Sequence, residues 1–305
     1  MSWTARSIPD QSGRTAVVTG ANSGIGYVTA RELARRGARV VLACRSEQRG
    51  AAALDRLLSQ VPEAQVELRV LDLADLASVQ SFAEALPYER IDLLINNAGV
   101  MAVPYARTVD GVETQFAVNH LGHFALTGLL LERLLAAPGA RVVTVSSMAH
   151  VLSNIDINDL SSERRYRPMV AYAASKTANL LFVRELAHRA DHKGLDLTAA
   201  AAHPGYASTE LQVRGAQLAG SVLRERLARL SNSVFGTSAD QGAAPSLYAA
   251  TAPYVHGDSF FGPRILGVRG GPGPSWRASW TRNDIAAGQL WAASERLTGV
   301  TYQGL

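Results

Sequence analysis

The sequence Thr15-Ala-Val-Val-Thr-Gly-Ala-Asn-Ser-Gly-Ile-Gly26 joins an apolar strand pattern, a glycine-rich turn and the start of a helical pattern. Glycines allow a tight turn and a close approach of the backbone to a pyrophosphate, and a helix N-terminus offers free N–H groups and partial positive charge. Between a strand and a helix, such a turn predicts a nucleotide-phosphate site, although its Gly-x-x-x-Gly-x-Gly spacing differs from the common dinucleotide fingerprint. The alternative is a helix cap at Asn22 or Ser23 with incidental glycines. The expected contacts are Gly20, Asn22, Ser23, Gly24, Ile25 and Gly26.

Strand-like apolar runs alternate with helical patterns through the first two hundred residues. The expected strands are Thr15–Thr19, Arg39–Ala43, Val66–Leu71, Leu93–Asn96, Arg141–Ser146 and Leu197–His203, and the expected helices are Ile25–Arg36, Glu47–Leu58, Leu76–Leu86, Val112–Ala136 and Tyr172–Arg189. Near-continuous apolar strands are typical of a parallel sheet with helices on both faces. The pattern therefore predicts an α/β protein, a single-domain doubly wound Rossmann fold over residues 1–305. The Gly- and Pro-rich stretch 267–274 is expected to be a loop.

Two insertions, residues 150–171 and 206–237, are too long for ordinary connections. Both follow the carboxyl ends of expected strands, where open α/β sheets bind ligands, so we expect them to shape a substrate site. The second insertion mixes leucines at helical spacing with arginines, which fits either an amphipathic lid or a dimer face of a homo-oligomer. Trp276, Trp280 and Trp291 are expected to be packing residues.

The composition is that of an ordinary globular protein. Of 305 residues, 47% are hydrophobic and 18% are charged, and the net charge is +4. The arginines are scattered and no basic stripe with interleaved aromatic residues occurs, which argues against nucleic-acid binding. Cys44 is the sole cysteine, so no internal disulfide can form, as fits a reducing compartment. The sequence has no signal-like apolar segment and no run of about 18 apolar residues, so we expect a cytoplasmic protein without a membrane span.

The end of the second expected strand bears on the choice of nucleotide. An acidic residue there would bind the adenosine ribose and select NAD, but the sequence reads Ala43-Cys44-Arg45. Arg45 is suited to pair with a 2′-phosphate, so the expected cofactor is NADP (NADPH). The alternative is a surface arginine at the start of a helix. After the third strand, Asp72 either caps the following helix or lies, with Leu73, near the adenine.

Two asparagine positions are also of interest. Asn96-Asn97-Ala98-Gly99 ends the fourth expected strand, and its small residues would let the chain pass close to a cofactor. The alternative is an ordinary turn. Asn119 lies in an apolar helical pattern, where asparagine is unfavourable and needs partners. It is either a satisfied core amide or a residue that distorts the helix to hold a water. His120 and His123 lack acidic or cysteine companions, so we expect them to be structural and predict no metal site.

Hydroxyl groups and one lysine complete the candidate site. Ser146 and Ser147 end the fifth expected strand, and only one of them should face a ligand because successive strand side chains alternate. Tyr172 and Lys176 are four residues apart on an expected helix and share one face. Only Lys176 and Lys193 among thirty basic residues are lysines. A cation beside a phenol lowers the phenol pKa, which would give an acid and base that works near neutral pH. The alternative is a solvated surface pair.

Together these pieces resemble the short-chain dehydrogenase/reductase family. The matching pieces occur in the family's order and cover nearly the whole chain: the turn at 19–26, Asn96–Gly99, Asn119, the serine pair, Tyr172 with Lys176, and His203-Pro204-Gly205. Within the family, the amino-acid sequences of residues 43–45, 146–150 and 203–211 are most similar to those of the retinol-dehydrogenase-like branch. Ser147 lies further before Tyr172 than in shorter members, which leaves the shape of the site mouth open.

The resemblance implies an NADP(H)-dependent oxidoreductase that interconverts a carbonyl and an alcohol on a lipophilic small molecule. The implied catalytic residues are Asn119, Ser147, Tyr172 and Lys176. Ser147 and Tyr172 would hydrogen-bond the carbonyl oxygen, Tyr172 would supply the proton, Lys176 would hold the nicotinamide ribose, and Asn119 would position a relaying water. The other implied cofactor contacts are Asn97, Ala98, Gly99, Pro204, Gly205 and Thr209.

Two rival interpretations stay open at this point. One is a non-catalytic NADP-binding sensor on the same fold, although such proteins commonly lack the tyrosine or the lysine that this chain has. The other is a double-bond reductase similar to the protochlorophyllide reductases. Activity on a panel of carbonyl compounds would separate these interpretations from the carbonyl chemistry.

Overall fold

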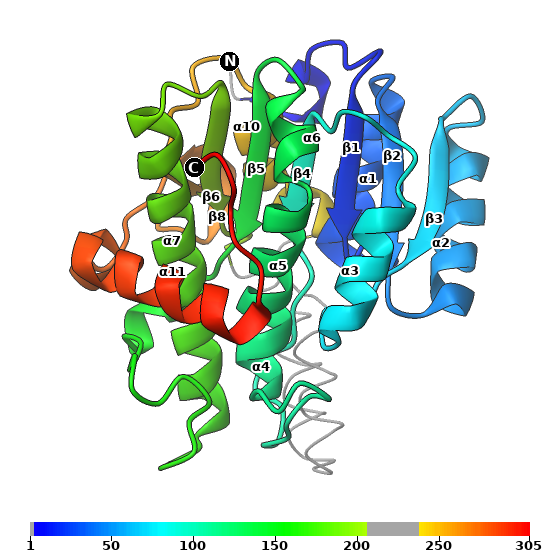
Figure 1. Cartoon of the computed structure of the whole chain (residues 1–305). Coiled ribbons are helices and arrows are strands. Elements are labelled where there is room, and N and C mark those ends of the chain that lie inside the picture. Colours follow the sequence, from blue (N-terminus) through cyan, green and yellow to red (C-terminus); the bar gives the residue numbers. More distant parts are fainter. Residues whose placement is uncertain (1–2, 206–237) are drawn as a thin grey trace, which may run out of the picture.

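The computed structural model describes residues 3–205 and 238–305, and its centre is one eight-stranded sheet (Figure 1). The strand order is β3-β2-β1-β4-β5-β6-β7-β8, and all neighbours are parallel except β7 and β8. The strands are β1 (Thr15–Thr19), β2 (Arg39–Cys44), β3 (Val66–Val70), β4 (Leu93–Asn96), β5 (Ala140–Val145), β6 (Leu197–Ala202), β7 (Ser259–Ile265) and β8 (Arg269–Pro274).

Helices cover both faces of this sheet. They are α1 (Gly24–Arg35), α2 (Glu47–Gln60), α3 (Leu76–Ala85), α4 (Thr114–Phe116), α5 (Gly122–Leu129), α6 (Leu131–Leu135), α7 (Pro168–His192), α10 (Ala239–Thr251) and α11 (Asp284–Thr298). Four short helices are η1 (Ala5–Ser7), the π-helix η2 (Ala117–Leu121), η3 (Met148–Leu152) and η4 (Ser279–Arg282). The chain reverses its strand order between β1 and β4, and the carboxyl ends of the parallel strands lie at the bottom of Figure 1.

Alternation along the strands divides the interior into two cores. Val17 of β1 packs with α3, α5, α7 and α11 on one face, whereas Ala16 and Val18 pack with α1, α2 and α10 on the other. All three side chains are fully buried. A strand that is buried on both sides has a continuous run of apolar residues in the sequence. This is why β1, β4 and β5 could be predicted from the sequence.

The helix ends follow local chemistry. Asp75 caps α3, because its carboxylate accepts hydrogen bonds from the amides of Ala77 and Ser78. Pro168 stands in the first turn of α7, where its missing N–H is not needed. Gly299 ends α11 in the left-handed region, at a φ of 68°. The doubly wound single α/β domain predicted from the sequence is confirmed.

The expected loop at 267–274 is wrong over most of its length. Residues Arg269–Pro274 form β8, which pairs with β7 in antiparallel register, and β7 itself was not expected. β8 contains Pro272 and Pro274, which cannot donate backbone hydrogen bonds and are tolerated in a strand at the edge of a sheet. The sequence did not predict this strand, because glycine and proline are rare in strand interiors.

The single expected helix at 112–136 is also wrong. The segment is divided into α4, the π-helix η2, α5 and α6, with α5 and α6 separated at Leu130. The π-helix is centred on Asn119. A π turn inside an α-helix adds a residue to one turn and is frequent at functional sites.

No helix in the described parts of the chain, 3–205 and 238–305, is long and apolar enough to cross a membrane. The same residues contain no cluster of three or more His, Cys, Asp or Glu side chains that could hold a metal ion. His120 and His123 are instead hydrogen-bonded within the core. The ring of His120 pairs with Ser294 Oγ at 2.9 Å, and that of His123 pairs with Thr19 Oγ1 at 2.9 Å.

Buried neutral histidines should make the protein sensitive to acid. Burial lowers the pKa of His120 and His123 to about 3 and that of His203 to about 4, against 6.5 in the unfolded chain. The unfolded chain therefore binds protons that the native protein does not, as the pH falls from about 6.5 towards 4. We expect the free energy of unfolding to decrease over this window, by up to about 1.4 kcal/mol per pH unit for each histidine. Urea denaturation at pH 7.5, 6 and 5 measures it, and equal stability at all three would contradict the expectation.

Candidate active site

Two turns lie side by side at the carboxyl ends of the neighbouring strands β1 and β4. Thr19 Oγ1 accepts hydrogen bonds from the amides of Asn97 and Ala98, both at 2.9 Å. The Asn97 side chain donates in return to the carbonyl of Thr19 at 2.7 Å. These bonds fasten the 96–99 turn to the glycine turn, at the point of the sheet where the strand order reverses. In open α/β sheets this is the crevice that binds ligands.

The glycine turn is packed too closely for a side chain at Gly26. A Cβ on Gly26 would lie 2.4 Å from Asn97 Nδ2 and 2.5 Å from the carbonyl oxygen of Gly20. Gly24 opens α1 at a φ of 55°, and a Cβ there would face open space. Asn22, Ser23 and Gly24 are half-buried, whereas Ile25 is buried in the core. The structure thus has an open cradle at the N-terminus of α1, and its shape suits a phosphate group.

Replacement of Gly26 by alanine should damage both stability and the cradle. The new methyl group must displace the Asn97 side chain or the Gly20 backbone, and overpacking of this kind costs about 1–3 kcal/mol. We expect the free energy of unfolding to fall by this amount and dinucleotide affinity to fall by roughly tenfold or more. Urea denaturation and a fluorescence titration with NADPH measure the two effects.

Gly288 offers a matched control, because it also lies in a helix but a Cβ there would meet nothing within 4 Å. Gly288→Ala should therefore be neutral or stabilising by up to about 1 kcal/mol. If Gly26→Ala changed the free energy of unfolding and the NADPH affinity no more than Gly288→Ala does, the close packing around Gly26 would contribute nothing to stability or binding.

The ends of β2 and β3 lie beside this cradle in the sheet. Arg45 follows β2 directly and is exposed. Asp72 does not cap α3, as one interpretation had it, since Asp75 does so; its carboxylate accepts from the amide of Ala74 at 3.0 Å. Leu73 is 6% exposed, and its carbonyl packs closely against Gly122 of α5. Its side chain belongs to the core.

Asn119 is both a satisfied amide and the centre of a distorted turn. Its Oδ1 accepts from the amide of Val100 at 2.8 Å, and its Nδ2 donates to the Val100 carbonyl and to Ser175 Oγ, both at 2.9 Å. The residue is fully buried. Asn119 therefore ties the segment after β4 to helix α7. A Cβ on Gly99 would lie 3.0 Å from Asn119 Oδ1 and 3.5 Å from Lys176 Nζ, so these groups adjoin.

The two serines after β5 have different surroundings. Ser146 is buried, and its hydroxyl donates to the backbone carbonyl of Lys176 at 2.8 Å. Ser147 is half-buried and caps the N-terminus of η3, where its Oγ accepts from the amide of Ala149 at 3.1 Å. That bond occupies a lone pair but leaves the hydroxyl hydrogen free to be donated. The hydroxyl hydrogen of Ser146 is therefore committed to the backbone, whereas that of Ser147 is not.

Tyr172 and Lys176 lie in the second turn and beyond on α7, and both are largely buried, with exposed fractions of 8% and 4%. The Nζ of Lys176 lies 5.8 Å from the centre of the Tyr172 ring and donates to the carbonyl of Val145 at 3.0 Å. Burial lowers the pKa of Lys176 to about 8.

The expected lowering of the tyrosine pKa by the lysine is wrong. Burial raises the pKa of Tyr172 above its usual value, and the neighbouring Ser147 hydroxyl offsets only part of this effect. The physical reason is that the phenol loses its hydration while the ammonium group is turned to Val145 rather than to the phenol oxygen. A phenol in this environment stays protonated at neutral pH.

The remaining predicted positions lie at the end of β6. Pro204 and Gly205 follow His203 and are half-buried. Gly205 donates its amide hydrogen to Nδ1 of His203 at 3.1 Å. Thr209, the insertion 206–237 and its lid or dimer face lie outside the described residues.

Sequence reasoning missed three polar residues that contact these groups. Ser175 binds both Asn119 and the carbonyl of Tyr172. His150 binds the carbonyl of Ser147, and Ser275 binds His203. Ser175 had a usable signal, since it precedes Lys176 on the same helix. Ser275 had none, because its neighbours in space are far away in the sequence.

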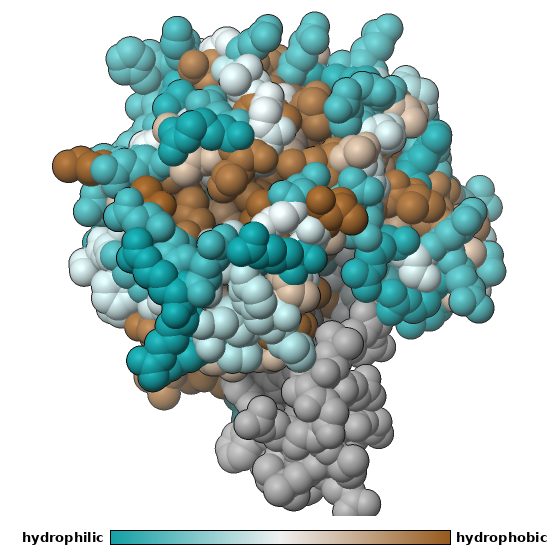
Figure 2. Space-filling view, turned by 60° about the horizontal axis from the view of Figure 1, so that its bottom comes forward, coloured by the Kyte–Doolittle hydropathy of each residue, from teal (hydrophilic) through white to brown (hydrophobic). Residues whose placement is uncertain are grey.

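Figure 2 shows the face of the molecule that contains the carboxyl ends of the strands. Hydrophobic side chains gather at its centre, within a rim of hydrophilic ones.

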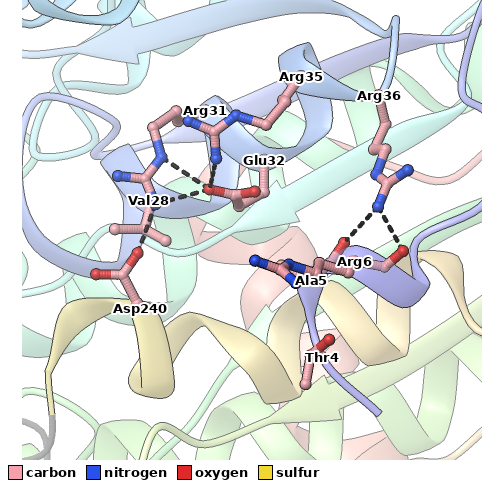
Figure 3. Close-up of a pocket in the computed structure, with 9 residues that line it drawn as sticks. All are labelled: Thr4, Ala5, Arg6, Val28, Arg31, Glu32, Arg35, Arg36 and Asp240. Carbon is pink, nitrogen blue, oxygen red and sulfur yellow. Dashed lines mark hydrogen bonds and ion pairs between the residues drawn. The ribbon is translucent and has the colours of Figure 1, made fainter. Parts of the chain in front are cut away.

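A separate hollow of about 540 Å³ lies at the other end of α1, bounded by η1 and α10 (Figure 3). Arg31 forms ion pairs with Glu32 and Asp240, and Arg35 pairs with Glu32. Arg36 donates to two backbone carbonyls of η1. These arginines are committed to partners within the protein and lie away from Tyr172, so we assign no part of the active site to this hollow.

The strand order, with its reversal between β1 and β4 and the glycine turn at that point, defines a Rossmann-type α/β protein. Residues 14–217 match the family model described as short chain dehydrogenase. The chain belongs to the short-chain dehydrogenase family. The resemblance found in the sequence is thereby confirmed.

Curated relatives lie in the branch that the sequence indicated. Retinol dehydrogenase 12 of Mus musculus is 44% identical over 296 residues, which cover 95% of this chain and 88% of the relative. Retinol dehydrogenase 13 of Homo sapiens is 42% identical over 294 residues, which cover 94% and 85%. The likeness to the retinol-dehydrogenase branch is confirmed.

Two solved structures are also similar. An uncharacterized protein from Mycobacterium paratuberculosis has 47% sequence identity and a TM-score of 0.83, with 99% of both chains covered. A protein from Beutenbergia cavernae, described as an NAD(P)-dependent gluconate 5-dehydrogenase with bound NADP, has 29% identity and a TM-score of 0.61. The match covers 81% of this chain and 94% of that one.

Proposed function

We propose that the protein is an NADP(H)-dependent oxidoreductase that interconverts a carbonyl and an alcohol on a lipophilic small molecule. The observation that carries the proposal is the convergence of three groups at one edge of the sheet: the open cradle of α1, the Ser147 hydroxyl, and the buried pair of Tyr172 and Lys176. The names of the curated relatives, retinol dehydrogenases, favour alcohol and carbonyl chemistry on a lipophilic substrate.

The proposed residues divide the chemistry between them. A bound nicotinamide dinucleotide would supply or accept the hydride. Ser147 donates a hydrogen bond to the carbonyl oxygen, and Tyr172 donates the proton that the oxygen needs as it becomes an alcohol. Lys176, largely protonated at neutral pH because its pKa is about 8, would hold a ribose hydroxyl of the cofactor. Asn119, which lies beside Lys176, would position a water that relays protons to the lysine.

The cradle residues would hold the cofactor. Gly20, Asn22, Ser23, Gly24, Ile25 and Gly26 would surround its phosphates, Asn97, Ala98 and Gly99 would pass beside it, and Asp72 and Leu73 would lie nearest the adenine. The resemblance implies that Pro204, Gly205 and Thr209 would border its nicotinamide half. Arg45 supports NADP over NAD because it is exposed at the end of β2, where a 2′-phosphate is bound in this fold. Arg49 is also exposed, in the first turn of α2.

Exposed apolar side chains support a lipophilic substrate. They come from the 150–171 insertion and from the β7–β8 hairpin and the segment after it: Leu152, Met169, Val170, Leu266, Val268 and Trp276. The hairpin lies beside the site, since a Cβ on Gly267 would be 3.7 Å from the sulfur of Met148, next to Ser147. Trp276 is 63% exposed, so the expectation that it is a packing residue is wrong.

A screen of purified protein tests the proposal. NADPH oxidation is followed at fixed cofactor with lipophilic ketones and aldehydes, and the reverse reaction with the matching alcohols and NADP⁺. We expect turnover with at least one lipophilic carbonyl and a higher kcat/KM than for short water-soluble analogues. NADPH binding without turnover of any carbonyl would instead favour the sensor interpretation.

A further inference from the structure

The segment Ser275–Ala278, which links β8 to η4, is fastened firmly to the sheet. The amide of Ser275 donates to the carbonyl of Phe260 in β7 at 2.8 Å. Arg277 is 8% exposed and forms a two-pronged ion pair with Asp258, with its Nη1 at 2.6 Å from Oδ1. Arg184 of α7 binds the same carboxylate at 2.6 Å. Bidentate pairs of this kind hold a fixed geometry, so the 275–278 segment is a rigid platform.

His150 connects this platform to Ser147. Its Nε2 accepts a hydrogen bond from the amide of Ala278 at 3.1 Å. A backbone amide can only donate, so Nε2 carries no proton and Nδ1 must carry it. Nδ1 then donates to the carbonyl of Ser147 at 2.7 Å. The His150 carbonyl also accepts from the hydroxyl of Thr177, the residue after Lys176, at 3.1 Å. The His150 ring thus joins the 275–278 segment to the Ser147 turn, and the His150 backbone carbonyl joins that turn to α7.

His203 connects the same platform to the Pro204-Gly205 turn, with the opposite tautomer. Its Nδ1 accepts from the amide of Gly205 at 3.1 Å, so its Nε2 carries the proton and donates to Ser275 Oγ at 2.8 Å. The ring is fully buried and lies over Gly262, where a Cβ would be 1.8 Å from Nε2. Only glycine fits beneath it. The rings of His150 and His203 both contact Phe260, with centres 5.6 and 5.0 Å away.

We propose that the 275–278 segment, through His150 and His203, positions the Ser147 hydroxyl and the Pro204-Gly205 turn for the reaction. The inference rests on the proposed function and adds positioning residues to it; both histidines would act through the groups that they bind within the protein. Shape alone does not explain the arrangement, because packing would be served by any ring of this size. Each histidine with its fixed tautomer also binds a specific backbone group at the site, the Ser147 carbonyl or the Gly205 amide, which an apolar ring could not do.

Two substitutions of His150 separate positioning from packing. Asparagine places a side-chain N–H where Nδ1 stands and keeps the bond to the Ser147 carbonyl, whereas glutamine places a carbonyl where Nε2 stands and keeps the bond to Ala278. We expect His150→Asn to retain kcat within about threefold and His150→Gln to lower kcat by about tenfold, because small displacements of a reacting group are costly. NADPH affinity should stay within about twofold in both variants.

Ser275→Ala probes the second connection without altering either histidine. It removes the acceptor of His203 and should weaken NADPH binding by about fivefold while kcat at saturating cofactor changes little. Ser279→Ala is its matched control, since Ser279 is exposed in η4 just beyond the segment, and it should match the wild type. A general loss of stability would not lower kcat alone in His150→Gln and weaken only cofactor binding in Ser275→Ala.

Amide hydrogen exchange gives a readout that does not depend on turnover. We expect faster exchange over 146–152 in His150→Gln and at Gly205 in Ser275→Ala, with Ser279→Ala unchanged. If the wild type reduces no carbonyl, the proposed function fails, while these exchange rates still decide the positioning role. Equal kcat in His150→Gln and His150→Asn with an active wild type, or unchanged exchange in His150→Gln and Ser275→Ala, would overturn the inference.

Discussion

Tyr172→Phe is expected to lower kcat by roughly 10²–10⁴-fold, the usual contribution of a positioned general acid. The substitution removes only the hydroxyl. The ring is 8% exposed and keeps its packing, so the fold and NADPH affinity should be retained. Steady-state kinetics on the best carbonyl found in the screen, a fluorescence titration with NADPH and thermal unfolding measure the three quantities.

Tyr302→Phe is the matched control for this loss. Its hydroxyl is also buried and donates to the carbonyl of Phe124 at 2.7 Å, away from the proposed site. Tyr302→Phe should cost about 1 kcal/mol of stability and leave kcat within about twofold. If Tyr172→Phe retained more than about a tenth of the wild-type kcat, Tyr172 would not be the proton donor.

Arg45→Asp is expected to change the preferred cofactor. The substitution removes a charge-assisted contact with a 2′-phosphate and puts a carboxylate in its place, which repels the phosphate and can accept hydrogen bonds from a ribose. We expect the ratio of kcat/KM for NADPH to that for NADH to fall by about 100-fold, equivalent to about 3 kcal/mol. Initial rates with both cofactors at one ionic strength measure the ratio.

Arg39→Asp controls for the change in net charge. Arg39 is exposed at the other end of the same strand, where it binds the side chain of Gln65 at 3.0 Å. It should leave the cofactor ratio unchanged within about twofold. An unchanged ratio in Arg45→Asp would remove Arg45 from cofactor selection and leave Arg49 as the candidate to test.

The parts of the fold that could be predicted are those whose local sequence has a clear pattern of apolar residues or glycines. β1 and β4 have the predicted limits, because both sides of each strand are buried and the apolar run has sharp ends. The cradle was predictable for a similar reason, since its glycines fall between a strand and a helix. The strands β7 and β8 could not be predicted, because they are strands by virtue of pairing with each other and their composition does not indicate it.

The environment of the candidate site was harder to predict than its residues. Spacing placed Tyr172 and Lys176 on one face of a helix, but burial and the nearby carbonyl of Val145 decide their pKa values, and neither is visible in the spacing. The π-helix at Asn119 depends on bonds to Val100 and Ser175. Such long-range contacts leave no periodic signal in the sequence.

The prolines of β8 have a consequence for self-association. A strand at the border of a sheet offers a row of backbone groups on which another chain can add a strand, and this is a common route to aggregates and to extended assemblies. Pro272 and Pro274 remove two amide hydrogens from that row. Growth of the sheet beyond β8 is therefore disfavoured, both in the native protein and in partly folded chains. Copies of this chain that associate should use helical surfaces in preference to this border.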